Sequence, residues 1–235
     1  MSKRAVVIEH DPSISLGNLE PVLREAGYDI EIVDARSVDL SSLDSSAADV
    51  VVVLGNDSGV YEKDHLTYIA EEEKWLASRL EAQRPTLGVC FGAQIMASAL
   101  GGEVYKGDST QIGYRTVTPT PEGATSPVAV FDGVPVVQWH GDTFTLPKQA
   151  TRLAGSSDYA NEAFAIDDWA LAIQFHPEVT VEIYRQWLAD GRESVANQGL
   201  SEVELMREHE ELNVRMQEAS AQMLRTWLRG LEKTQ

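Results

Sequence analysis

The single cysteine of the chain, Cys90, stands between two glycines in the segment Gly88-Val89-Cys90-Phe91-Gly92. An apolar run precedes this segment and an apolar helical pattern follows it, which is typical of a tight strand-to-helix turn that lifts one side chain above a sheet. The start of a helix stabilises a thiolate, the nucleophilic form of cysteine. The N–H of Phe91 is placed to stabilise a developing oxyanion. We therefore predict that Cys90 is a nucleophile, with an inert buried thiol as the alternative.

A proton-transfer partner for this cysteine is expected in the segment Gln174-Phe175-His176-Pro177-Glu178. Pro177 ends the apolar run that precedes it. Glu178 lies two residues after His176, where its carboxylate can orient the ring and stabilise the protonated form. His176 would accept the proton of Cys90 and later return one to a leaving amine. By itself this second segment also fits a loop histidine beside a solvated glutamate, but the two segments together predict a catalytic triad.

The elements that must position these segments alternate between β-rich and helical patterns in the first hundred residues. Strands are predicted over 5–8, 28–33, 50–54 and 86–89, and helices over 21–26, 69–80 and 94–100. This order predicts an α/β fold, an open and mostly parallel twisted sheet with helices on both faces. Turn signals then separate four short strands, which we expect to form antiparallel hairpins appended to the sheet, at 114–118, 136–139, 164–166 and 170–174.

The last part of the chain is predicted to be helical. One helix is expected over 181–189, and Ser201 with Glu204 forms a capping box that starts a long acidic helix. A narrow stripe recurs on this helix at steps of three and four residues, formed by Leu205, Leu212, Met216, Ala219, Met223 and Trp227. We expect the stripe to pack against its own domain, with a homodimer seam as the alternative. The predicted organisation is a domain over 1–190 and a helical C-terminal extension over 191–235.

Charge and cysteine content exclude several classes of protein. Lys and Arg number 19 against 37 Asp and Glu, so the formal net charge is -18. Such a surface repels nucleic acid and anionic lipid, and the sequence holds no apolar run of about 18 residues and no signal-peptide pattern. One cysteine excludes a disulfide framework or a Cys-rich metal site. We expect a cytoplasmic protein that binds no nucleic acid, membrane or metal, and in which His10, His65 and His209 occupy ordinary polar positions.

The two segments closely resemble those of the class I glutamine amidotransferases, which carry a Cys-His-Glu triad. Residues 88–94 match the family's Gly-x-Cys-x-Gly-x-Gln segment, and residues 174–178 match its Gln-Phe-His-Pro-Glu segment. The resemblance covers roughly residues 5 to 190. It implies that Cys90 is the nucleophile, His176 the acid and base, and Glu178 the orienting carboxylate, with no cofactor.

The resemblance also implies the oxyanion hole and one substrate contact. Gly55, at the end of the third predicted strand, matches a glycine whose backbone acts together with Phe91. The family usually continues with a second glycine and a proline, whereas Asn56 follows here, so the second donor is Gly55 or Asn56. Gln94 matches a glutamine that contacts the amino-acid end of the substrate.

Further residues are placed near the pocket by the same resemblance. Tyr61 belongs to a Val-Tyr pair that the family also has in this loop. The segment Trp139-His140-Gly141-Asp142 resembles one found in the subset related to the glutaminase domain of GMP synthetase, which includes stand-alone members. We expect Tyr61, His140 and Asp142 at the pocket, with His140 as a rim or structural residue rather than a second catalyst.

The function implied is hydrolysis of the γ-carboxamide of glutamine through a cysteinyl thioester, with release of ammonia. One alternative is a γ-glutamyl hydrolase or peptidase with a larger leaving amine, and a second is a non-catalytic regulatory or binding subunit. No phosphate-binding Gly-x-x-x-x-Gly-Lys loop is present. A synthetase or acceptor subunit is therefore the expected partner if ammonia is to be used.

Overall fold

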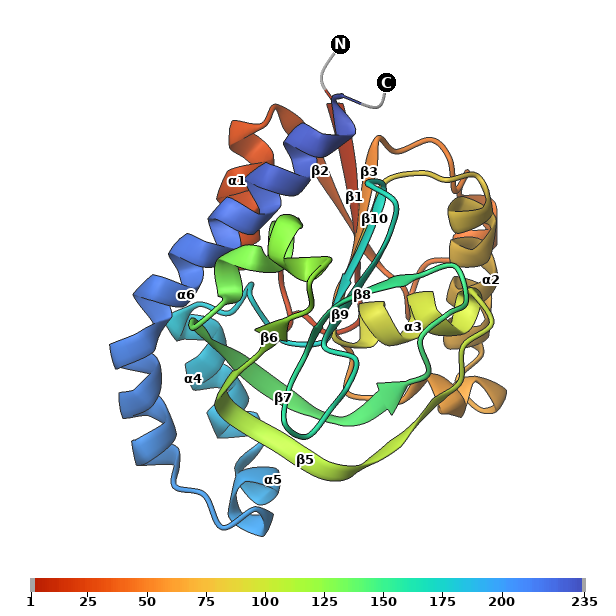
Figure 1. The fold of residues 1–235 in the computed structure, drawn as a ribbon. Helices are drawn as coiled ribbons and strands as arrows, with labels where there is room; N and C mark the ends of the chain where they lie inside the picture. Colours follow the sequence, from red (N-terminus) through yellow and green to blue (C-terminus); the bar gives the residue numbers. More distant parts are fainter. Residues whose placement is uncertain (1–2, 234–235) are drawn as a thin grey trace.

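The computed structural model describes residues 3–233, and within them eight strands form one sheet in the order β2-β1-β3-β4-β10-β9-β8-β6 (Figure 1). Five neighbouring strands are parallel, namely β2 (Tyr28–Asp34), β1 (Lys3–Glu9), β3 (Val50–Val53), β4 (Thr86–Val89) and β10 (Ala170–Ile173). Three strands continue the sheet in antiparallel pairing, namely β9 (Ala163–Ile166), β8 (Thr151–Gly155) and β6 (Thr118–Pro119). The predicted mostly parallel sheet is therefore confirmed.

Helices cover both faces of the sheet, as a parallel sheet requires. Val50 and Val52 of β3 pack in one core with α1 (Leu19–Glu25), α4 (Val181–Asp190) and α6 (Glu202–Leu231). Val51 and Val53 point to the other face and pack with α2 (Thr67–Glu81) and α3 (Phe91–Ala99). Because successive side chains of a strand alternate between faces, a continuous run of buried valines holds the two helical layers on one strand. Short 3₁₀ helices lie at Leu40–Ser42, Val60–Asp64, Gly123–Thr125 and Pro127–Phe131.

The middle of the chain differs from the expectation in one respect. The predicted strands at 164–166 and 170–174 do form an antiparallel hairpin, β9 with β10, and β10 joins it to β4. The predicted strand at 136–139 lies in β7 (Pro135–Phe144), and that at 114–118 lies mainly in β5 (Val104–Thr116), while its last residue, Thr118, begins β6. Strands β5 and β7 form a two-stranded sheet of their own and are not appended to the main sheet. Within residues 3–233, an isolated bridge between Val137 and His176 connects β7 to the segment after β10.

The C-terminal helix packs on its own domain, as predicted. Ser201 caps α6 by accepting a hydrogen bond from the N–H of Glu204, and α5 (Arg192–Asn197) precedes it. Of the six stripe residues, Leu212 is half-buried and the other five are buried in the core that α1 and α4 share. The stripe is therefore covered by other residues of the same chain. A homodimer stays a prediction, and it would have to use another face of the helix. The domain boundary at residue 190 also stays a prediction.

The first strand begins close to where the last helix ends (Figure 1). Lys3 Nζ lies 2.6 Å from Glu232 Oε1. Both residues lie at the edge of the sheet where the parallel strands begin. Among residues 3–233, no helix is long and apolar enough to cross a membrane. The cytoplasmic location stays a prediction.

Candidate active site

Cys90 lies in the turn between β4 and α3, with an unusual backbone conformation. Its φ is 54° and its ψ is -107°, a combination that a non-glycine residue adopts only where the surrounding structure enforces it. A Cβ on Gly92 would come within 2.1 Å of the Val53 carbonyl oxygen, and one on Gly88 within 2.6 Å of the Gly92 backbone. Both glycines therefore permit α3 to start directly against β3 and β4, which holds the cysteine at the carboxyl end of the sheet.

His176 follows β10, the strand next to β4, so the topology places it beside Cys90. Its backbone N–H donates to the Val137 carbonyl at 2.8 Å, and its Nδ1 lies 2.6 Å from Glu178 Oε1. The ring packs edge-on against Trp187, with centroids 4.7 Å apart. Glu178 is fully buried behind the ring. The imidazole is thus held by backbone, carboxylate and indole, and Nε2 is the nitrogen left to face the cysteine.

The electrostatics of this group favour a protonated imidazole. Burial lowers the pKa of His176, but the charge of Glu178 and the charge and hydrogen bonding of Cys90 outweigh burial and raise it to about 10. Gln174 approaches from the same strand end, and its Nε2 lies 3.5 Å from the Cys90 sulfur. Gln94 Nε2 in turn donates to Gln174 Oε1 at 3.2 Å. A cationic ring and an amide donor beside one sulfur are suited to stabilising a thiolate.

The first N–H of α3 is available beside the cysteine. Phe91 begins the helix, and among residues 3–233 its N–H donates to no protein acceptor. The first N–H groups of a helix lack intrahelical partners and attract negative charge. Phe91 itself is buried, so it contributes its backbone and not its side chain to the space around Cys90.

A cavity of about 810 Å³ opens in front of these groups. Its lining includes most of the residues predicted from the sequence, namely Gly55, Asn56, Tyr61, Cys90, Gln94, His140, Asp142 and His176. Phe91 and Glu178 do not line it, because both side chains are buried behind the cysteine and the histidine. The structure therefore brings together predicted residues from four separate stretches of the chain.

One wall of the cavity carries a polar group of four side chains, from Tyr61, Lys106, His140 and Asp142. His140 Nδ1 donates to the Asp142 carbonyl at 2.9 Å, so Nε2 carries the lone pair. Burial lowers the pKa of His140 to about 4, and within the described chain Nε2 has no hydrogen-bond partner. Tyr61 Oη lies 3.5 Å from Asp142 Oδ1, and Lys106 Nζ lies 5.7 Å from the Tyr61 ring centre. The wall offers a neutral acceptor, a carboxylate and an ammonium group.

Two histidines expected at ordinary polar positions are fully buried, which makes that prediction wrong for His10 and His209. His209 of α6 stacks on Tyr184, with ring centres 4.3 Å apart, and bonds to the Tyr114 hydroxyl at 3.0 Å. Sequence reasoning also assigned no role to Gln174 at the sulfur. The signal for His10 was available, because it directly follows a buried strand at the edge where the other site residues gather. Within residues 3–233, no cluster of three or more His, Cys, Asp or Glu side chains could hold a metal ion.

A strand-to-helix cysteine turn beside a histidine and a carboxylate, on a parallel sheet, defines the class of α/β proteins built around a nucleophile elbow. The family model described as glutamine amidotransferase class-I matches residues 8–191, so the chain belongs to that family.

Relatives agree with this assignment. A glutamine amidotransferase from Thermotoga maritima has a TM-score of 0.86 and 26% identity, covering 99% of both chains. A glutamine amido transferase from Methylobacillus flagellatus, with a TM-score of 0.85, 22% identity and coverage of 98% and 96%, shows the same fold. A GMP synthase from Leifsonia xyli is 33% identical over 168 residues, which are 67% of this chain and 31% of that protein. The chain thus spans about a third of that GMP synthase.

Proposed function

We propose that the protein hydrolyses the γ-carboxamide of glutamine through a thioester on Cys90. The observation that carries this proposal is the position of the His176 ring, with Nδ1 at 2.6 Å from a buried Glu178 and the other edge facing Cys90. Membership of the family and similarity to the glutaminase region of GMP synthases support the same reaction. Cys90 is the nucleophile, His176 the acid and base, and Glu178 the orienting carboxylate.

The reaction proceeds in two halves. The thiolate of Cys90 attacks the carbonyl carbon of the γ-carboxamide, and the oxyanion accepts hydrogen bonds from the Phe91 N–H and from the turn at Gly55 and Asn56. The C–N bond breaks, and His176 gives its proton to the departing nitrogen, which leaves as ammonia. Water then attacks the thioester, His176 takes one of its protons, and the thiolate departs, so that glutamine and water become glutamate and ammonia.

We propose that the amino-acid end of the substrate lies against the polar wall formed by Tyr61, Lys106, His140 and Asp142. Gln94 is held between Gln174 and the Asp142 carbonyl, at 3.2 and 3.5 Å, so its amide is fixed at the cavity. The Asp142 carboxylate suits an α-ammonium group, and Tyr61 and His140 complete the polar wall. The ammonia would be consumed by a synthetase or acceptor subunit that docks at the cavity.

One observation favours the second candidate, a γ-glutamyl hydrolase with a larger leaving amine. The cavity of about 810 Å³ lies in the range of pockets that enclose drug-sized ligands, well above the need of one amino acid. Its wall on the His176 side also carries polar groups from Ser13, Asp190 and Ser194. A leaving amine larger than ammonia would lie on this side, because His176 delivers the proton to it.

A substrate panel tests both candidates. The purified chain is assayed for ammonia release from glutamine and for amine release from γ-glutamyl peptides and γ-glutamyl amines, with Cys90→Ala as the matched control. Turnover of glutamine supports the first candidate, and turnover of only the larger amides supports the second. Absence of both turnover and labelling of Cys90 by a glutamine-like electrophile would favour the non-catalytic alternative and overturn the proposal.

A further inference from the structure

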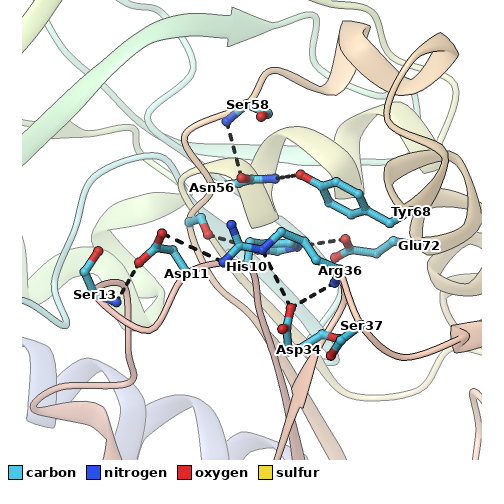
Figure 2. Close-up of polar contacts among 11 residues, drawn as sticks. His10, Asp11, Ser13, Asp34, Arg36, Ser37, Asn56, Ser58, Tyr68 and Glu72 are labelled. Carbon is cyan, nitrogen blue, oxygen red and sulfur yellow. Dashed lines mark hydrogen bonds and ion pairs between the residues drawn. The ribbon is translucent and has the colours of Figure 1, made fainter.

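A fully buried pair of polar side chains lies directly behind the turn at Gly55 and Asn56. His10 follows β1, and its Nδ1 lies 2.9 Å from the Gly55 carbonyl oxygen. Its Nε2 lies 2.8 Å from Oε2 of Glu72 on α2, and both side chains have no exposed surface. Figure 2 shows the His10 ring between these contacts, with Asn56 and Tyr68 beside the pair. The proposed reaction assigns no step to either residue.

The hydrogen-bonding pattern fixes one proton of this histidine. A carbonyl oxygen only accepts, so Nδ1 of His10 must carry a hydrogen and donate it to Gly55. Burial lowers the pKa of His10, but the charge and hydrogen bond of Glu72 and the bond to Gly55 outweigh it and raise the pKa. Burying two such groups carries a large desolvation penalty, so the presence of the His10–Glu72 pair is not explained by a gain in stability.

The bond to the Gly55 carbonyl determines where the next N–H points. In a trans peptide the C=O of Gly55 and the N–H of Asn56 point in opposite directions. Since the carbonyl faces His10 in the interior, the Asn56 N–H faces the side of the cavity, which Gly55, Asn56 and Cys90 all line. Within residues 3–233, this N–H donates to no protein acceptor.

The same histidine also contacts the other side of the predicted oxyanion hole. Its ring meets the ring of Phe91 in an edge-to-face arrangement, with centroids 4.8 Å apart. The side chain of Asn56 is fixed as well, because its Nδ2 donates to the Tyr68 hydroxyl at 3.0 Å. One buried ring therefore contacts the carbonyl of the peptide that carries the Asn56 N–H and the side chain of Phe91, the two residues of the predicted oxyanion hole.

We propose that His10 and Glu72 are positioning residues that orient the Gly55–Asn56 peptide, so that the Asn56 N–H is the second oxyanion donor. Glu72 holds the His10 ring, and His10 holds the Gly55 carbonyl, which aims the Asn56 N–H at the carbonyl oxygen of the substrate's γ-carboxamide. The pair contacts neither the substrate nor the sulfur. This inference rests on the proposed amide hydrolysis, because only that reaction develops the oxyanion.

The test compares two amide replacements of one histidine. The Asn Nδ2 of His10→Asn reproduces the donor to Gly55, whereas the Gln Nε2 of His10→Gln reproduces the nitrogen that faces Glu72. We expect His10→Gln to lower kcat about 10- to 100-fold, which is no more than the loss caused by removing an oxyanion donor outright. The KM of this variant should stay within about twofold of the wild-type value. His10→Asn should recover most of the rate. His65→Asn, at an exposed position, is the matched control and should behave as wild type.

A second measurement separates positioning from general damage. The rate at which iodoacetamide alkylates Cys90 needs the triad but no oxyanion hole, so both His10 variants should stay within about twofold of wild type. Three results would overturn the inference: equal kcat for the two variants, a higher kcat for His10→Gln than for His10→Asn, or an alkylation rate that falls as much as kcat does. If the wild type is active and the variants give one of these three results, this inference alone is contradicted. If the wild type turns over no γ-glutamyl compound, the proposed function and this inference are contradicted together.

Discussion

Replacing Gly92 by alanine tests whether the start of α3 must lie directly against β3. A Cβ at this position would stand 2.1 Å from the Val53 carbonyl oxygen and 2.8 Å from its carbonyl carbon. Both atoms belong to the backbone of a central strand, so no side chain can rotate away. Relief of the overlap needs a displacement of about 1 Å between the helix and the strand, since ordinary contacts of this kind lie near 3.3 Å or more.

The displacement has two expected consequences for Gly92→Ala. Overpacking of this kind costs about 1–3 kcal/mol in the free energy of unfolding. Cys90 and the Phe91 N–H move with the helix, and a misplacement of about 1 Å lowers kcat/KM about 100-fold. Urea unfolding monitored by circular dichroism gives the first quantity, and ammonia release from glutamine or amine release from the preferred γ-glutamyl amide gives the second.

Gly230→Ala is the matched control, because the same change is made where a Cβ meets no heavy atom of residues 3–233 within 4 Å. This glycine is the penultimate residue of α6, so alanine should change the free energy of unfolding by less than about 1 kcal/mol and leave turnover unchanged. A Gly92→Ala protein as stable and as active as wild type would refute the argument from close approach. So would an equal loss in both variants.

Four further outcomes are expected. Cys90→Ala should abolish turnover while the circular dichroism spectrum stays native, and a residual rate above background would contradict its role. Glu178→Ala should leave partial activity, because orientation of the ring is degraded rather than lost; unchanged kcat/KM would contradict this. Burial lowers the pKa of His209 to about 4, so between pH 6.5 and pH 4 the unfolded chain binds a proton that the folded chain does not. The free energy of unfolding should therefore fall as the pH is lowered from 6.5 to 4, by at most about 3 kcal/mol. Urea unfolding of His209→Gln should lack this contribution to the pH dependence. Met223→Ala, in the buried stripe of α6, should lower the unfolding free energy by about 2–5 kcal/mol, and a change below 1 kcal/mol would show that the helix packs loosely.

Local patterns were sufficient to predict the elbow and most of the parallel sheet. Val50–Val53 is a continuous apolar run, which is the pattern of a strand buried on both faces, and the structure has a buried strand there. Gly88 and Gly92 mark the close approach at Cys90 because only glycine fits there. The pairing of His176 with Cys90 was predicted from the two motif segments, whereas the parallel pairing of β10 with β4, which places their carboxyl ends at one edge, was not predicted.

Features that depend on distant partners were not predictable in this way. β5 extends over 13 residues and, in the described part of the chain, pairs with β7 alone; its separation from the main sheet follows from tertiary packing that no local pattern encodes. The bond between His10 and Glu72 joins residues 62 positions apart, and a histidine after a strand gives no indication of its acceptor. His209 lies on a helix whose stripe was recognised, but histidine is commonly a surface residue, so its stacking on Tyr184 was missed.

The ion pair between Lys3 and Glu232 links the first strand to the residue that follows the last helix. Both side chains are largely exposed, so the pair contributes little to the free energy of unfolding and weakens as salt is added. The attachment of α6 to the rest of the chain therefore depends on its buried apolar residues, and high ionic strength should leave that attachment intact.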